Sequence, residues 1–167
     1  MTIKVGDRVP DGTLTEFIAV ETEGCSLGPN AFQVGDLVKG KKIAVFAVPG
    51  AFTPTCSAKH VPSYVQNHEA LKSKGVDEIW CVATNDAFVM GAWAKDQGSQ
   101  GKLRMLADGS AKWTKALGLE LDLNERGMGV RSQRYSMLLD DGVVKVLNVE
   151  APGKYEVSDA ETMLKQL

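Results

Sequence analysis

The chain has 167 residues, 44% of them hydrophobic and 24% charged, with a formal net charge of −2 at pH 7. This length and composition predict one globular domain over residues 1–167 with a sizeable core. No basic run is present, which argues against nucleic acid as a partner. No apolar stretch reaches the roughly 18 residues of a membrane span, and residues 1–6 lack a secretion-signal pattern. We therefore expect a cytoplasmic protein, without membrane contact, whose three cysteines stay reduced.

The first half of the chain is predicted to alternate strands and helices. Pro10-Asp11-Gly12 precedes residues 13–20, which we expect to form part of a hairpin. The apolar run 43–48 predicts a buried strand, and Pro49-Gly50 ends it. A helix is predicted over residues 54–74.

That helix has clear signals at both ends. Thr53 is a suitable N-cap, and Pro54 suits the first helical position. Pro62 predicts a kink, and Gly75 predicts the end of the helix.

Cys56 falls in the first turn of this predicted helix. Free backbone N–H groups and the positive end of the helix dipole favour an anion there. Such a position favours the thiolate, which is the reactive form of cysteine. The sequence therefore predicts a nucleophilic sulfur at Cys56, although a buried and inert cysteine would be the ordinary alternative.

The second half continues the alternation. We expect strands over 76–83 and 103–106, helices after Asp86 and over 111–117, an ordered surface loop over 119–132, and a hairpin of 135–139 with 143–147. Ser158 and Glu161 form a capping-box pattern for a C-terminal helix. This order of elements predicts an α/β protein with a thioredoxin-like fold, in which helices flank a central mixed β-sheet.

The residues around Cys56 resemble the peroxiredoxin family. Its Pro-x-x-x-Thr-x-x-Cys pattern is present as Pro49, Thr53 and Cys56, and the Val130–Met137 segment is similar to its arginine-bearing strand, with Arg134 before Tyr-Ser-Met. The sequence around Cys56 is similar to that of the peroxiredoxin 5 subfamily, which includes the plant type II enzymes. Further similar blocks cover nearly the whole chain.

The resemblance implies a thiol peroxidase that reduces hydrogen peroxide and alkyl hydroperoxides. Cys56 would attack the peroxide and become a sulfenic acid. Thr53 would hold the peroxide, Arg134 would stabilise the developing charge, and Pro49 would shield the sulfur from water. Arg131 competes with Arg134 for this role, and the family pattern favours Arg134. No cofactor or metal is needed, because the sulfur is the redox centre.

The sequence leaves open which thiol reduces the sulfenic acid of Cys56. Cys81 is a possible resolving thiol, but it lies in an apolar strand, where a core residue is the simpler interpretation. We favour reduction by glutaredoxin with glutathione, or by thioredoxin. Cys25 is interpreted as incidental. The resemblance also implies a homodimer, with aromatic side chains near the active-site loop lining the contact.

Other interpretations remain. Cys56 and His60 are four residues apart and could share a metal, but a site with two ligands would be weak, so we expect His60 to border the active-site pocket. A redox-sensing module that docks to a partner is a second possibility. A thiol–disulfide oxidoreductase is a third, although Thr53 and Lys59 stand where a Cys-x-x-Cys motif would need a second cysteine.

Overall fold

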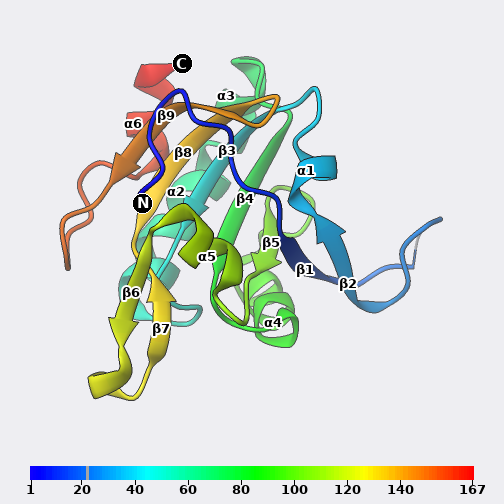
Figure 1. The fold of residues 1–167 in the computed structure, drawn as a ribbon. Helices are drawn as coiled ribbons and strands as arrows, with labels where there is room; N and C mark the ends of the chain where they lie inside the picture. Colours follow the sequence, from blue (N-terminus) through cyan, green and yellow to red (C-terminus); the bar gives the residue numbers. More distant parts are fainter. Residues whose placement is uncertain (22) are drawn as a thin grey trace.

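The computed structural model describes residues 1–21 and 23–167 (Figure 1). The strands are β1 (Thr13–Ile18), β2 (Gly28–Gln33), β3 (Lys42–Ala47), β4 (Glu78–Ala83), β5 (Arg104–Ala107), β6 (Glu120–Leu123), β7 (Gly129–Ser132), β8 (Tyr135–Asp140) and β9 (Val143–Val149). The helices are α1 (Val34–Leu37), α2 (Val61–Gln66), α3 (His68–Ser73), α4 (Ala87–Gln97), α5 (Lys112–Leu117) and α6 (Ala160–Gln166). A π-helical segment, η1 (Cys56–His60), precedes α2, and a 3₁₀ turn, η2 (Asn124–Arg126), lies between β6 and β7.

Seven strands form one mixed sheet in the order β2-β1-β5-β4-β3-β8-β9. The central strands β3, β4 and β5 run parallel, whereas β8 runs antiparallel to β3. Residues 43–48 and 79–83, the apolar parts of the segments that predicted β3 and β4, are buried, as central strands covered on both faces require. The predicted α/β fold with a central mixed sheet and flanking helices is confirmed.

Two apolar clusters fill the space on the two faces of the sheet. One cluster draws on α2, α3, α4 and α6 and contains both Cys56 and Cys81. The other draws on α1, α5 and the N-terminal segment. Figure 1 shows α5 and the N-terminal segment on one side of the sheet and α2 and α6 on the other. Among the described residues, no helix is long and apolar enough to cross a membrane.

Several turn and cap predictions are confirmed. Asp86 caps α4, because its carboxylate accepts from the N–H of Val89 at 2.9 Å. Asp141 and Gly142 both have positive φ, which fits a two-residue hairpin between β8 and β9. The segment after Gly12 pairs with β2 as the predicted N-terminal hairpin.

The helix predicted over 54–74 is less regular than expected. It starts at Pro54, widens into η1, continues as α2 and breaks at Asn67 before α3. Pro62 has no N–H to donate to the preceding turn, and the wide turn lies directly before it. The N–H of Val61 accordingly bonds to the carbonyl of Cys56.

Two further predictions are wrong. Residues 119–132 are not a loop, because β6 and β7 pair in register there as a two-stranded sheet. The cap of α6 is Asp159, whose carboxylate accepts from the N–H of Thr162 at 3.1 Å. Ser158 instead donates its hydroxyl to Glu150. Serine and aspartate are both favoured N-cap residues, so local preference alone did not distinguish Asp159 from Ser158 as the cap.

Candidate active site

Sheet register brings the predicted site residues together. Ala47 at the end of β3 lies opposite Tyr135 at the start of β8. Pro49 follows β3 and Arg134 precedes β8, so both lie at the same edge of the sheet. Cys56 lies at the same edge, near the start of the helix that follows β3, and its side chain is fully buried.

Arg134 is the residue that touches the sulfur. Its Nη2 lies 3.1 Å from Sγ of Cys56, although the two residues are 78 positions apart in the sequence. A guanidinium keeps its positive charge at all physiological pH values, so it stabilises negative charge on this sulfur. The competing residue, Arg131, donates instead to the carbonyls of Met128 and Pro49, at 2.7 and 3.2 Å. Arg131 therefore supports the loop beside the sulfur.

His60 lies behind Arg134. It was expected to border the pocket, but it is fully buried and does not line the cavity. Its Nε2 lies 3.0 Å from the carbonyl oxygen of Ser158, and its Nδ1 lies 2.8 Å from Nη1 of Arg134. A carbonyl only accepts and a guanidinium only donates, so the ring is neutral with its proton on Nε2. Both ring nitrogens are engaged, which leaves neither for a metal.

Burial accounts for the neutral imidazole. Desolvation, reinforced by the positive charge of Arg134, lowers the pKa of His60 to about 3. The phenol of Tyr64 donates to the same Ser158 carbonyl at 3.0 Å, and burial raises the pKa of that phenol. His60 thus acts as a fixed hydrogen-bond acceptor that orients Arg134 toward Cys56.

Glu150 holds the segment that carries the Ser158 carbonyl. Its carboxylate accepts from the backbone N–H groups of Glu156, Val157 and Ser158 at 2.8–2.9 Å and from the Ser158 hydroxyl at 2.6 Å. Burial alone would raise the pKa of Glu150, but these hydrogen bonds outweigh it and lower the pKa. The sequence analysis missed this group, because its partners lie in an irregular segment with no motif.

The loop between β3 and the helix is tightly constrained. The Thr53 hydroxyl donates to the carbonyl of Gly50 at 2.7 Å, and among the described residues no helix N–H donates to its oxygen, so the predicted side-chain cap does not form. The lone pairs of the hydroxyl remain able to accept. A Cβ at Gly50 would lie 2.7 Å from Nη1 of Arg131, so a side chain there would displace this guanidinium. Phe52 adopts a left-handed φ of 63°, which a bulky side chain rarely does, and strain of this kind is frequent at functional sites.

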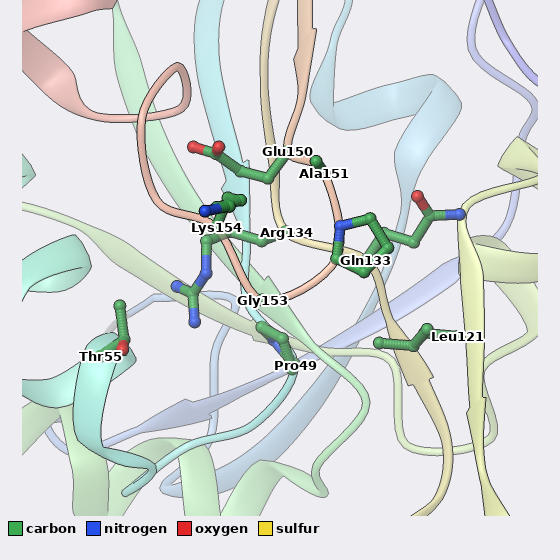
Figure 2. A pocket seen from close by; sticks show the side chains of 10 residues that line it. Pro49, Thr55, Leu121, Gln133, Arg134, Glu150, Ala151, Gly153 and Lys154 are labelled. Carbon is green, nitrogen blue, oxygen red and sulfur yellow. The ribbon is translucent and has the colours of Figure 1, made fainter.

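A cavity of about 290 Å³ opens in front of Arg134. Figure 2 shows the guanidinium of Arg134 extending into it, between Thr55 and Lys154. The residues around it are Pro49, Thr55, Leu121, Gln133, Arg134, Glu150, Ala151, Pro152, Gly153 and Lys154. Leu121 comes from β6, so the segment that was expected to be a surface loop supplies one wall.

None of the three cysteines lines this cavity; Arg134, which does line it, connects it to the buried Cys56 sulfur through its 3.1 Å contact. Cys81 is fully buried in β4, with Phe46 and Met105 as its neighbours on adjacent strands. Burial first, then the nearby Cys56 sulfur, raises the pKa of Cys81 well above its usual value. Cys25 lies half-buried between β1 and β2. All three thiols are free in this structure.

Comparison with known proteins identifies the family. The sequence model of the Redoxin family matches residues 4–164. Peroxiredoxin-2B of Arabidopsis thaliana is 52% identical, over 99% of this chain and 98% of its own. The chain is a peroxiredoxin. Among solved structures, reduced Prx3 from Vibrio vulnificus in complex with hydrogen peroxide shares 50% identity with it over 99% of both chains, with a TM-score of 0.91.

Another solved structure carries a different name. A protein from Burkholderia cenocepacia, described as a thioredoxin reductase, is 61% identical over 100% of this chain and 99% of its own, with a TM-score of 0.99. The thiol–disulfide alternative is not supported here, because Thr53 and Lys59 occupy the positions where a Cys-x-x-Cys pair would need its second thiol. As a peroxiredoxin, the chain is a thiol-dependent peroxidase that reduces peroxides at the expense of thiol reductants.

Proposed function

We propose that Cys56 carries the peroxidase reaction of this peroxiredoxin and that Arg134, Thr53 and Pro49 form the site around its sulfur. The observation that carries this proposal is the 3.1 Å contact between Nη2 of Arg134 and Sγ of Cys56. A charged donor at this distance stabilises the thiolate and also the charge that develops on a peroxide oxygen beside it.

In the first step, the Cys56 thiolate attacks the terminal oxygen of the peroxide. The S–O bond forms as the O–O bond breaks, and the leaving oxygen takes a proton and departs as water or an alcohol. Sulfur is thereby oxidised to a sulfenic acid. The Thr53 hydroxyl, whose proton is used by Gly50, accepts the hydrogen bond of the peroxide O–H. Pro49 contributes a nonpolar wall that limits access of water.

An external thiol completes the cycle. The sulfenic acid condenses with this thiol to form a mixed disulfide and water, and a second thiol then releases reduced Cys56. Glutaredoxin with glutathione, or thioredoxin, is the proposed source. Burial of Cys81 supports this route, because its raised pKa disfavours the thiolate that would resolve the intermediate.

The direct test is the mass of the intact protein after one equivalent of hydrogen peroxide. A rapid gain of one oxygen that glutathione reverses, and that is absent in Cys56→Ser, is expected. Full peroxide consumption by Cys56→Ser would overturn the assignment. Cys25→Ser is the matched control, and it should behave like the parent protein.

We also propose a homodimer that forms through the exposed aromatic side chains beside the active-site loop. Phe52 and Phe88 are 53% and 65% exposed, so both rings offer apolar surface to a second copy of the chain. Phe52 lies against the buried Trp93, with ring centroids 6.3 Å apart, so the exposed ring borders the apolar core. Sedimentation should give a dimer for the parent protein and a monomer for Phe88→Asp; a monomeric parent would refute the proposal.

Two further properties are proposed from the sequence. Residues 1–167 form one domain, which predicts coincident unfolding transitions by tryptophan fluorescence and circular dichroism.

The location is cytoplasmic, which cell fractionation tests. The relatives include proteins named as chloroplastic and mitochondrial, so an organelle is the alternative outcome.

A further inference from the structure

The cavity in front of Arg134 is larger than hydrogen peroxide requires. It measures about 290 Å³, whereas one water molecule occupies roughly 30 Å³ of liquid and hydrogen peroxide is only slightly larger. Much of its wall is nonpolar and comes from Pro49, Leu121, Ala151 and Pro152. Such a cavity suits a molecule that carries a carbon skeleton next to its reacting group.

Three charged residues line this cavity, and two of them are already engaged. Arg134 donates to Cys56 and His60. The Glu150 carboxylate accepts hydrogen bonds from its own segment. Lys154 is exposed, and within residues 1–21 and 23–167 its ammonium has no carboxylate partner within 4 Å. The neutral donors to Glu150 leave its negative charge in place, so Arg134, Glu150 and Lys154 together give the cavity one net positive charge.

A backbone turn sets the position of Lys154. Its N–H bonds to the carbonyl of Ala151 at 3.0 Å and closes a turn, with Gly153 at a positive φ of 75°. Glu150 anchors one side of this turn. On the other side, the Tyr155 ring lies 5.1 Å from the His60 ring. Lys154 is thus held at the wall of the cavity that Arg134 also lines (Figure 2).

We propose that Lys154 makes this cavity a carboxylate-binding subsite, which selects molecules that carry a carboxylate away from the atom that reacts at Cys56. The proposal rests on Cys56 as the reacting group. Two sources of the carboxylate share this chemistry: a hydroperoxide with an acid group, which oxidises Cys56, and glutathione, which reduces the sulfenic acid. The nonpolar wall takes the intervening carbon chain.

The test compares each acid with its own ester in single-turnover kinetics. For oxidation, the pair is a hydroperoxyhexanoate and its methyl ester. For reduction of the preformed sulfenic acid, the pair is glutathione and its diethyl ester. An exposed ion pair contributes up to about 1 kcal/mol, so we expect an acid-to-ester rate ratio of about three to five at low salt, falling as salt is added.

Variants assign the preference to Lys154. The ratio should fall to about one in Lys154→Met, fall below one in Lys154→Glu and persist in Lys154→Arg. Lys145→Met removes an equal charge from the outer strand β9 and should keep the parent ratio. A preference only in the oxidation pair identifies the hydroperoxide as the source, and one only in the thiol pair identifies glutathione.

Two results would overturn the proposal: a ratio of one for both pairs in the parent protein, or a preference that Lys154→Met leaves intact. Hydrogen peroxide, which has no carboxylate, separates this failure from failure of the proposed function. If the parent protein does not oxidise Cys56 with hydrogen peroxide, the role of Cys56 is wrong. If it does and both ratios are one, only the subsite is wrong.

Discussion

Nη1 of Arg134 lies 2.8 Å from Nδ1 of His60, and this contact requires a histidine that stays neutral. The other ring nitrogen donates to the carbonyl of Ser158, so the chain of contacts runs from Ser158 through His60 and Arg134 to Cys56. A protonated ring would place a donor against the guanidinium and break this chain. The low pKa of His60 is thus a structural requirement of the site.

His60 should make the protein less stable in weak acid. Its pKa of about 3 in the folded state lies below the 6.5 of the unfolded chain, so the unfolded state binds the extra proton. The free energy of unfolding should therefore fall as pH drops from about 6.5 to 4.5, by up to about 1.4 kcal/mol per pH unit. Urea unfolding at several pH values measures this slope. His60→Leu should remove most of it, and an unchanged slope in that variant would contradict the prediction.

Arg134→Lys should slow oxidation of Cys56 even though it keeps the charge. An ammonium cannot reproduce the fixed pair of contacts to Cys56 and His60. Loss of one such donor at a site of developing charge typically costs about a hundredfold in rate. Stopped-flow tryptophan fluorescence with hydrogen peroxide measures the rate of Cys56 oxidation. Arg131→Lys is the matched control and should lose much less, because Arg131 donates to the backbone carbonyls of Met128 and Pro49 and not to the sulfur. Equal losses would indicate that Arg131 takes part in the reaction.

Cys81→Ser should retain most turnover with a glutaredoxin and glutathione system. Cys81 is fully buried between its neighbours on β3 and β5, and its high pKa leaves little thiolate. Peroxide-treated parent protein should gain one oxygen and not lose two hydrogens. A variant that forms the sulfenic acid normally but no longer turns over would instead make Cys81 the resolving thiol.

Glu150→Gln should loosen the segment that carries Ser158. One carboxylate oxygen accepts from Val157, from the Ser158 N–H and from the Ser158 hydroxyl. The oxygen of an amide would be an uncharged, weaker acceptor in this place, and its NH2 would bring a donor against the N–H of Glu156. We expect a loss of about 1–3 kcal/mol in the free energy of unfolding. Faster amide hydrogen exchange at residues 156–158 should accompany it. Glu156→Gln is the control, since its own side chain is exposed and it contributes only a backbone N–H; similar losses in both variants would argue against a special role of the Glu150 carboxylate.

The sequence by itself determined the elements whose signals are local. The apolar runs of β3 and β4, the Asp86 cap and the Asp141-Gly142 turn each depend on residues within a few positions of one another. The position of Cys56 at the start of a helix, and the family pattern around it, are local in the same sense. Helix periodicity did not reveal the wide turn before Pro62, because that turn depends on how the backbone accommodates a missing donor.

Tertiary structure decided the partners of Cys56. Arg134 reaches the sulfur because β3 and β8 pair with Ala47 opposite Tyr135, and register is a property of the assembled sheet. The position of His60 behind Arg134 had no sequence signal, because its partner Ser158 lies 98 positions away. Glu150 had none either, because its partners lie in irregular backbone that no motif predicts. The short strands β6 and β7 were missed because alternation over four residues is too brief to distinguish from a polar loop. Their pairing brings Leu121 to the cavity wall, so the shape of the site depends on contacts that form only when the chain is folded.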